Sequence, residues 1–380
     1  MPTPSVLIVP NRLKAGILYS QLPANGDVDF SVTRATIAYR TNASGILESV
    51  ASGVPRLDYP IGGGCPSLLV EPAATNLVLR SEEFSDVIWV KNTTTVTANA
   101  EVAPNGATTA ETMTVSTVDS RVEQTTVLGA GTYTFSVYVR LIAQTTAGVM
   151  RLQVNTDGSN VSVNFTPTTQ WQRVTATVTA VTGVTAVRIR GLTFVGTIAI
   201  WGAQLEVGSV ATSYIPTVAA TATRNADVIS KTGVSGFIGQ TEGTIYAEVN
   251  LTEWTNAKRI FAISDGTQNN RIAFLINTTN RIRALVTQTG ATQADINTST
   301  GLANGVYKIA LAYAANDFVL YVNGSQIGTD TSGAVPACTD VYLGKLETSS
   351  ATLQLNDRIR AAAIYPTRLT NSQLASLTTL

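Results

Sequence analysis

The stretch Val306–Thr329, VYKIALAYAANDFVLYVNGSQIGT, decides the fold of this chain. Two runs in it send alternate side chains to opposite faces, and the second run ends at Asn323-Gly324 before a third, short run. An Asn-Gly pair between alternating runs favours a type I′ hairpin turn, because both central residues of that turn need φ > 0. Both runs are apolar on both faces, which is typical of strands inside a layered structure. The stretch therefore predicts the centre of a β-sandwich.

The same period of two recurs along most of the chain. Runs such as GTYTFSVYVR (Gly131–Arg140) form a first group, and runs such as EGTIYAEVNL (Glu242–Leu251) form a second group. Their spacing predicts two tandem β-sandwich domains of the jelly-roll kind, at residues 81–216 and 231–380. Residues 217–230 are mostly small and polar, and we expect them to be a linker.

Residues 1–80 break this pattern. Eight prolines and the triplet Gly62–Gly64 interrupt their short apolar runs, and proline cannot donate a hydrogen bond to a sheet. We therefore expect residues 1–80 to be an extended N-terminal arm that attaches the protein to a partner.

The C-terminal run RLTNSQLASL (Arg368–Leu377) predicts the one short helix of the chain. Thr370 is a good N-cap, Gln373 completes a capping box, and Leu369 with Leu374 forms a hydrophobic staple. The predicted fold class is thus all-β, with an extended N-terminal arm, two tandem sandwiches and a short C-terminal helix.

Composition excludes several classes of function. Lys plus Arg and Asp plus Glu number 25 each, so the chain lacks the cationic surplus that binding to nucleic acid requires. No segment approaches the roughly 18 apolar residues that span a bilayer, so we expect no membrane insertion. Histidine is absent, which removes the commonest general base and a usual zinc ligand. The two cysteines, Cys65 and Cys338, fall in different predicted domains, and we expect unpaired thiols.

The order of the motifs resembles that of bacteriophage virion proteins. TNLVLRSEEFSDVIWV from Thr75, followed by GTYTFSVYVR, WQRVTATVTA and IAIWGAQLEVGSVATSYIPT, is similar to a jelly roll of the carbohydrate-binding-module kind. GTIYAEV, RIFAISDG, YKIALAYAANDFVLYVNG and RLTNSQLASL are similar to the concanavalin A-like or laminin-G-like sandwich that follows it in those proteins. The resemblance covers roughly residues 70–380 and implies a tail fibre, or a head fibre or decoration protein. It places residues 1–80 where such proteins contact the rest of the virion.

One segment suggests catalysis. Glu248-Val-Asn-Leu-Thr-Glu253 is similar to the Glu-x-Asp-x-x-Glu strand of concanavalin-like glycosidases, in which the two glutamates act as nucleophile and acid. Here the central Asp is replaced by Asn250, and the segment lies on the first strand of its domain. We therefore expect two solvated glutamates, no catalytic residue and no enzyme activity.

A second segment suggests calcium. The loop Asp265-Gly-Thr-Gln-Asn-Asn270 offers one carboxylate together with amide and carbonyl oxygens, which are ligands that calcium accepts. A polar turn between strands explains the loop equally well, so we expect no cofactor and no metal site.

Glycan binding needs an exposed aromatic ring beside amide, carboxylate or guanidinium groups. The best candidates form one group in the last domain: Trp254, Arg259, Asp265, Asn269 and Asn270. The alternative for Trp254 is a half-buried aromatic at a sheet edge.

The sequence thus predicts a non-enzymatic virion protein, exposed on the particle and assembled as a homo-oligomer, with a trimer as the expected form. Its partners are itself, other virion proteins through residues 1–80 and host-surface glycan. Two alternatives remain open, namely a purely structural joint that packs against neighbouring subunits and a carboxylate-dependent glycan hydrolase.

Overall fold

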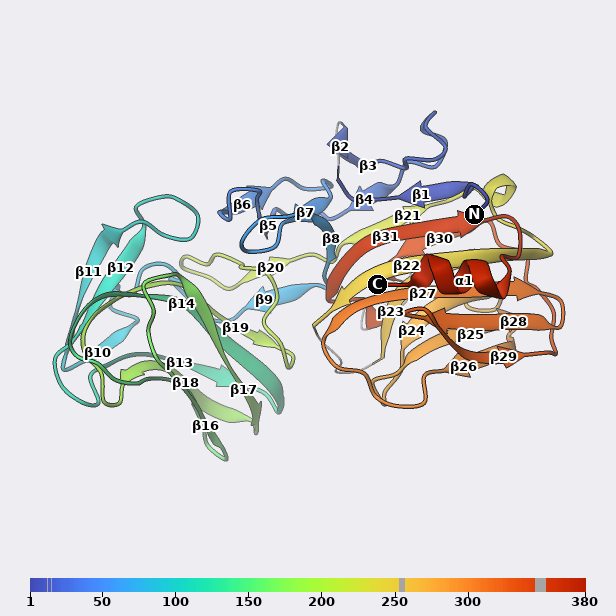
Figure 1. The fold of residues 1–380 in the computed structure, drawn as a ribbon. Coiled ribbons are helices and arrows are strands. Elements are labelled where there is room, and N and C mark those ends of the chain that lie inside the picture. The colour runs from blue at the N-terminus through green and yellow to red at the C-terminus, as the bar shows by residue number, and fades with distance from the viewer. Residues whose placement is uncertain (12, 15, 253–256, 346–352) are drawn as a thin grey trace. The chain divides into compact units, whose positions relative to one another are not determined.

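The computed structural model describes residues 1–11, 13–14, 16–252, 257–345 and 353–380. The chain divides into two compact units (Figure 1). Unit 1 comprises Met1–Gly45, Val50–Ala73 and Asn225–Leu380, and unit 2 comprises Ile46–Ser49 and Ala74–Arg224. Almost all regular structure is β-strand, so the all-β prediction is confirmed. None of the described helices is long and apolar enough to span a bilayer.

The first sheet of unit 1 has eight antiparallel strands in the described part of the chain. Their order is β29-β28-β27-β22-β31-β8-β7, and β1 pairs with the same edge of β31 as β8 does. The bounds are β1 (Val6–Ile8), β7 (Arg56–Asp58), β8 (Ser67–Val70), β22 (Glu242–Leu251), β27 (Gly305–Ala314), β28 (Asp317–Val322), β29 (Ser325–Asp330) and β31 (Asp357–Tyr365).

The second sheet of unit 1 has seven strands within the described residues, in the order β26-β25-β24-β23-β30-β21-β4. Their bounds are β4 (Ser31–Thr33), β21 (Val228–Lys231), β23 (Lys258–Ser264), β24 (Arg271–Ile276), β25 (Ile282–Gln288), β26 (Ala291–Asn297) and β30 (Asp340–Leu343). Unit 1 also contains the short elements β2 (Leu13–Lys14), β3 (Ile17–Leu18), β5 (Ala38–Thr41) and the 3-10 turn η1 (Ser235–Phe237). Strand β6 (Leu47–Val50) lies almost entirely within the segment Ile46–Ser49, which belongs to unit 2.

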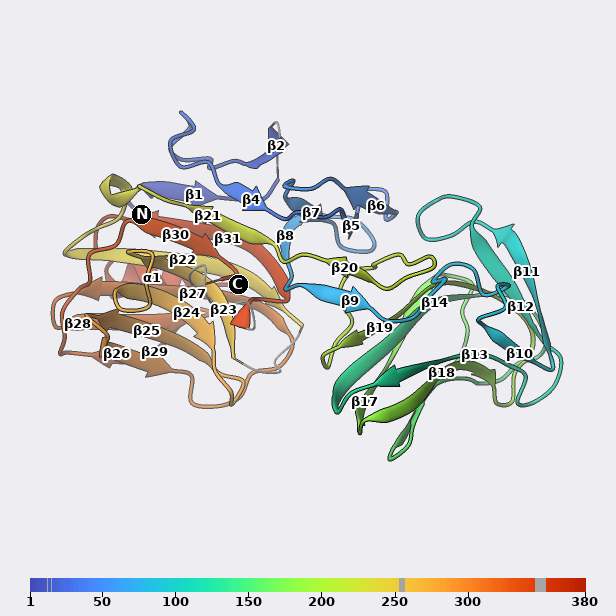
Figure 2. The same cartoon turned by 180° about the vertical axis from the view of Figure 1, so that it is seen from behind.

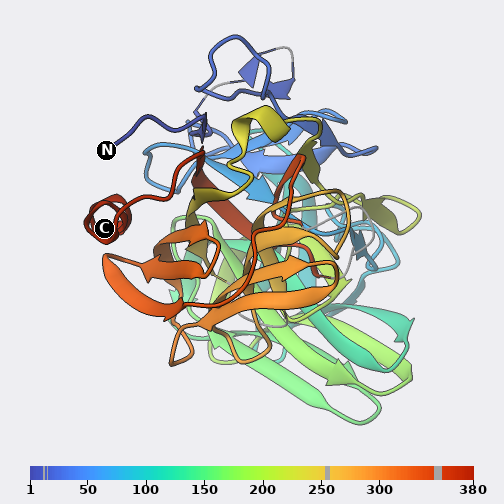
Figure 3. The same cartoon turned by 90° about the vertical axis from the view of Figure 1, so that its right-hand side faces the viewer.

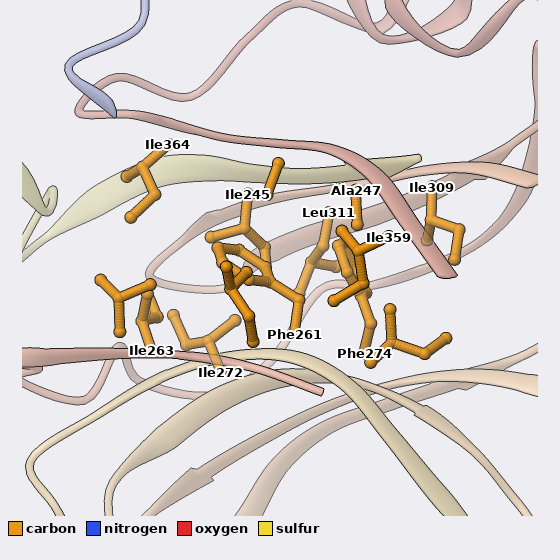
Figure 4. Packing of buried hydrophobic residues seen from close by; sticks show 14 of the residues in the cluster. Ile245, Ala247, Phe261, Ile263, Ile272, Phe274, Ile309, Leu311, Ile359 and Ile364 are labelled. Atoms are coloured by element: carbon orange, nitrogen blue, oxygen red, sulfur yellow. The ribbon is translucent and has the colours of Figure 1, made fainter. Parts of the chain in front are cut away.

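The two sheets of unit 1 enclose one apolar core. Alternate residues of each strand enter it, such as Ile245 and Ala247 from β22 and Phe261 and Ile263 from β23 (Figure 4). Because side chains alternate between the faces of a strand, the period-two pattern in the sequence is what places them there.

The hairpin of the opening stretch forms as predicted. Asn323 and Gly324 have φ values of 48° and 80°, and the flanking residues Val322 and Ser325 are cross-strand partners. Ile309 and Leu311 enter the core between the sheets, which confirms that this stretch lies at the centre of a sandwich.

The predicted helix is α1 (Asn371–Thr378), and its N-cap is Thr370 with a complete capping box. It packs on the outer face of the first sheet, where small side chains such as Ala310 and Ala312 let it approach closely and Tyr246 flanks it. Figure 3 shows α1 nearly along its axis, outside the sheet. The helix covers only one part of that face.

Residues 1–80 differ from the expected extended arm. Strands β1 and β8 pair with β31, β7 pairs with β8, and β4 pairs with β21. The prolines lie between these short strands, so they do not remove sheet hydrogen bonds. This segment therefore supplies strands to both sheets of unit 1.

Unit 2 is a second sandwich, inserted into unit 1 along the chain instead of preceding it. In the described residues one sheet has five strands in the order β10-β13-β18-β15-β16, and the other has five in the order β11-β12-β19-β14-β17. Their bounds are β10 (Val90–Asn92), β11 (Thr94–Glu101), β12 (Ala110–Val115), β13 (Arg121–Leu128), β14 (Gly131–Thr146), β15 (Met150–Thr156), β16 (Asn160–Phe165), β17 (Gln172–Ala180), β18 (Gly183–Gly191) and β19 (Val195–Val207). A separate pair is formed by β9 (Ala74–Asn76) and β20 (Ala222–Arg224).

The expected linker at residues 217–230 is partly strand. Within it, β20 pairs with β9 in unit 2, and β21 pairs with β4 and β30 in unit 1. Small and polar residues signalled a connection there, but backbone pairing does not depend on apolar side chains.

Candidate functional site

The residues predicted to bind glycan do not gather at one place. Trp254 lies outside the described residues. Arg259 stands near the start of β23, whereas Asp265 follows the end of the same strand. At a rise of about 3.3 Å per residue, these two positions are roughly 20 Å apart along the strand. A role in glycan binding for these residues stays a prediction.

The Asp265–Asn270 loop is closed by its own hydrogen bonds. Asp265 Oδ1 accepts from the Thr267 backbone N at 2.9 Å and from Thr267 Oγ1 at 2.6 Å, and Asp265 Oδ2 accepts from Asn270 Nδ2 at 2.7 Å. Burial opposes ionisation of Asp265, but these hydrogen bonds prevail and hold its pKa below the usual value. Asn269 is exposed beside this turn. A calcium ion would have to displace these donors, and the described residues contain no cluster of three metal-ligating side chains.

Of the two glutamates in the suspected hydrolase segment, only Glu248 can be placed, because Glu253 lies outside the described residues. Glu248 Oε1 contacts Arg360 Nε at 2.9 Å, and Glu248 Oε2 accepts from Tyr246 OH at 3.4 Å. Both oxygen atoms are therefore occupied by protein groups. Burial, followed by the charge of Glu248, raises the pKa of Tyr246.

A polar pocket of about 380 Å³ lies elsewhere in unit 1. The residues of β22 and β31 that line this pocket alternate with residues of the core, so they lie on the outer face of the first sheet. The pocket opens on the part of that face that α1 does not cover. Its lining comes from β5, β7, β8, β22, β31 and the loop between β7 and β8: Thr41, Asp58, Tyr59, Pro60, Ile61, Gly64, Cys65, Ser67, Asn250, Arg358 and Arg360.

Two arginines in this pocket each form an ion pair with a carboxylate through the Nε atom. Arg358 Nε contacts Asp58 Oδ2 at 2.7 Å, and the Asp58 side chain is only 4% exposed. Arg360 Nε contacts Glu248 in the same manner, and its own side chain is 44% exposed. The Nη groups of both arginines have no hydrogen-bond partner within the described protein. A guanidinium held in this way presents a fixed fork of donors to a ligand.

A β-bulge directs Arg360 to the pocket. Glu248 pairs with Ala361, but its neighbour Val249 pairs with Ile359, so Arg360 is the extra residue in β31. Bulges bend a strand and turn a side chain away from its regular position. Here the bulge leaves Arg360 on the outer face, beside the carboxylate that holds it.

Uncharged groups complete the pocket. Asn250 adds an amide, Tyr59 adds an aromatic ring and a hydroxyl, and Ser67 adds a second hydroxyl. The loop between β7 and β8 turns through Gly62 and Gly63, which have φ values of 96° and 91° that other residues rarely adopt. The arrangement can donate several hydrogen bonds and stack one flat surface.

Sequence reasoning missed this pocket. Its lining combines residues from positions 41–67, 250 and 358–360, and no motif connects these segments. The one available signal was the alternation of Arg358 and Arg360 about Ile359, which places both arginines on one face of a strand. The two cysteines are unpaired, as predicted; Cys338 is buried and Cys65 is exposed at the pocket.

A family description, the concanavalin A-like lectin/glucanases superfamily, matches residues 219–375, which supply most strands of both sheets of unit 1. A search of curated proteins found no match.

Several solved structures are similar to part of the chain. The CBM40 of the Ruminococcus gnavus IT-sialidase, bound to alpha2,3 sialyllactose, is 17% identical over 37% of this chain and 84% of its own, with a TM-score of 0.33. Domain 4 of AbnA, a GH43 extracellular arabinanase from Geobacillus stearothermophilus in complex with arabinotriose, is 14% identical over 46% of this chain and 84% of its own, with a TM-score of 0.33. A heptameric SAP-like pentraxin from Limulus polyphemus is 15% identical over 35% and 68%, with a TM-score of 0.28. Likenesses at these scores carry no argument about a ligand.

Proposed function

We propose that this chain, whose residues 219–375 match a concanavalin A-like domain, binds glycans without cleaving them and uses the pocket of unit 1 as the binding site. The observation that carries the proposal is the pair of arginines, Arg358 and Arg360, each oriented by an ion pair beside the amide of Asn250. Sugar hydroxyls and carboxylates accept hydrogen bonds from such donors, and a ring such as that of Tyr59 stacks on the apolar face of a sugar.

The size of the pocket supports a small saccharide. About 380 Å³ falls within the range of small-molecule sites. The fixed orientation of both guanidinium groups also favours binding, because they lose little conformational freedom when a ligand binds.

The carboxylates support binding without hydrolysis. Most glycosidases use two carboxyl groups about 5–9.5 Å apart across the scissile bond. Asp58 is the one carboxylate among the residues described as lining the pocket, and its oxygens accept from Arg358 Nε and from the Thr41 backbone N. We therefore assign no catalytic role to the pocket.

The biological setting is proposed from the sequence resemblance alone. In this proposal the protein is a bacteriophage tail fibre, or a head fibre or decoration protein. It assembles as a homotrimer and attaches to host-surface glycan. Contact with other virion proteins through residues 1–80 would use the exposed parts of strands that belong to unit 1. The alternative, a structural joint, predicts no saccharide ligand.

A glycan array with the full chain tests the proposal. We expect binding to at least one surface saccharide, and we expect Arg360→Gln to weaken it at least tenfold because the variant loses a charged donor. Arg283→Gln is the matched control, since Arg283 forms a comparable exposed ion pair with Asp295 away from the pocket. Binding that survives Arg360→Gln, or no binding to any saccharide, would contradict the proposed site.

Cysteine labelling gives an independent test. Cys65 lines the pocket, whereas Cys338 is 1% exposed and burial raises its pKa to about 12. A maleimide at pH 7 should therefore modify Cys65 alone in the folded protein. A saturating concentration of the array ligand should slow this reaction several-fold, and prior labelling should block binding. Equal labelling rates with and without ligand would place the saccharide elsewhere.

A further inference from the structure

Unit 2 carries a row of arginines that the proposed function does not use. Strands β10, β13, β18, β15 and β16 are neighbours in one sheet, and β13 and β18 are seen side by side in Figures 1 and 2. Their register aligns five polar residues across the sheet, one from each strand: Asn92, Arg121, Arg190, Arg151 and Asn164. A fourth arginine, Arg188, lies in the adjacent row, between Glu123 and Gln153. We call these two rows the arginine face.

The arginine face points away from the core of unit 2. Residues between the arginines, such as Val122, Ile189 and Leu152, are fully buried in that core. Because side chains alternate along a strand, the arginines must lie on the opposite face of the sheet. The side chains of Arg121 and Arg190 are 31% and 23% exposed.

Folding alone does not account for this arrangement. Arg121 is directly opposite Arg190, and Arg190 is directly opposite Arg151. Like charges in directly opposed positions destabilise a sheet. The described carboxylates that contact the four arginines are Glu123 and Asp119, so the face keeps a positive surplus.

These contacts orient the arginines more than they neutralise them. Glu123 accepts from Arg188 Nε and contacts Arg121 Nε at 3.3 Å. Burial opposes ionisation of Glu123, but its bonds to Arg188 and Arg121 prevail and hold its pKa below the usual value. Arg151 Nε donates to Asn164 Oδ1 at 3.0 Å. The Nη groups of Arg121, Arg151 and Arg188 have no partner in the described structure.

An unsatisfied amide lies among them. Gln153 is 4% exposed and donates from Nε2 to Asn160 Oδ1 at 2.9 Å, but its Oε1 has no hydrogen-bond partner among the described atoms. Asn155 Oδ1, two residues further along β15, also lacks one. Buried acceptors in native proteins are nearly always paired, so these two oxygens leave the polar network of this sheet incomplete.

We propose that the arginine face binds an anionic polysaccharide, whose carboxylate or sulfate groups pair with the arginines. Neighbouring strands lie about 4.8 Å apart, which is comparable to the length of one sugar residue, so successive acidic sugars can meet successive arginines. Nucleic acid fits less well. The two rows contain no aromatic side chain in the described residues on which a base can stack, and the chain has no net positive charge.

Binding of polymers to the full chain at low salt tests this proposal. The probes are polygalacturonate, dextran sulfate, neutral dextran and single-stranded poly-dT. We expect binding to polygalacturonate or to dextran sulfate that weakens as salt rises, no binding to dextran and weaker binding to poly-dT. The two acidic polymers separate carboxylate from sulfate recognition.

The variant Arg151→Gln/Arg190→Gln should lose at least tenfold in affinity for the acidic polymer. Its melting temperature should stay equal or rise, because like-charge repulsion is removed. Arg283→Gln on unit 1 removes one positive charge away from the arginine face; it is the control and should bind normally. Arg360→Gln should also bind normally, so failure of the unit 1 pocket and failure of the arginine face are distinguishable. Unchanged affinity in the double variant, equally tight poly-dT binding, or no binding to either acidic polymer would overturn the proposal.

Discussion

At the scale of single residues, unit 1 contains a buried ion cluster. Arg56 is fully buried and contacts Glu71 at 2.6 Å and also Asp227. Asp227 further contacts Arg34 at 2.7 Å. Burial opposes the charge of Arg56, but Glu71 and Asp227 prevail and raise its pKa, so the guanidinium stays charged at every working pH. The cluster joins four separate segments of the chain.

Arg56→Met should lower the free energy of unfolding by about 3–5 kcal/mol, because it removes a buried counter-charge from Glu71 and Asp227. Urea unfolding followed by the reactivity of Cys338, which is buried in unit 1, measures the loss. Arg283→Met, which breaks an exposed ion pair, should change stability by less than about 1 kcal/mol. A loss of similar size in both variants would show that the buried cluster has no special role.

At the scale of elements, helix α1 and the bulge in β31 divide the outer face of the first sheet. The helix covers the part with small side chains, and the bulge places Arg360 at the part that stays open. Both depend on local geometry: a capping box begins the helix, and one extra residue turns the strand.

Thr370→Ala should destabilise unit 1 by about 1 kcal/mol, because the Gln373 backbone N loses its acceptor. Thermal unfolding monitored by calorimetry reports the change as a lower midpoint of the unit 1 transition. Ser376→Ala, in the exposed middle of the same helix, is the control and should be neutral or slightly stabilising. Equal midpoints for wild type and Thr370→Ala would mean that the cap is not formed in solution.

At the scale of the whole molecule, the two units have separate cores. The described core of unit 1 draws on residues 6–70 and 229–364, and that of unit 2 on residues 78–205. The chain enters the long segment of unit 2 at Ala74 and leaves it at Arg224, and these two positions are close together because they are cross-strand partners. Within unit 1, Asp227 N donates to Glu71 O at 3.0 Å, which holds both ends of the insertion.

Replacing residues 74–224 by Gly-Gly should therefore leave a folded unit 1, because a short loop costs little entropy to close. We expect cooperative unfolding, a reactive Cys65 and a protected Cys338. Saccharide binding should persist, and binding of acidic polymers should disappear. A product that binds hydrophobic dyes, or that exposes Cys338, would show that unit 1 needs unit 2 to fold.

Local patterns allowed much of this fold to be predicted. The Asn323-Gly324 turn, the Thr370 cap and the two-faced strand Gly305–Ala314 each depend on neighbouring residues, so the chain itself carries their signals. The pocket could not be predicted in this way, because Asp58, Asn250 and Arg358 are far apart in sequence and meet only through strand pairing.

The sequence by itself determined that this chain is all-β and layered, through its period-two pattern, and that it has one short C-terminal helix, through its capping motif. Both signals act over a few neighbouring residues. Tertiary structure alone decided that residues 1–45 and 50–73 belong to unit 1, that unit 2 is inserted, and that Arg121, Arg190 and Arg151 align across three strands. The physical reason is that sheet register joins backbone groups with little regard to sequence distance. Which polar side chains meet on a face is fixed only when the strands pair.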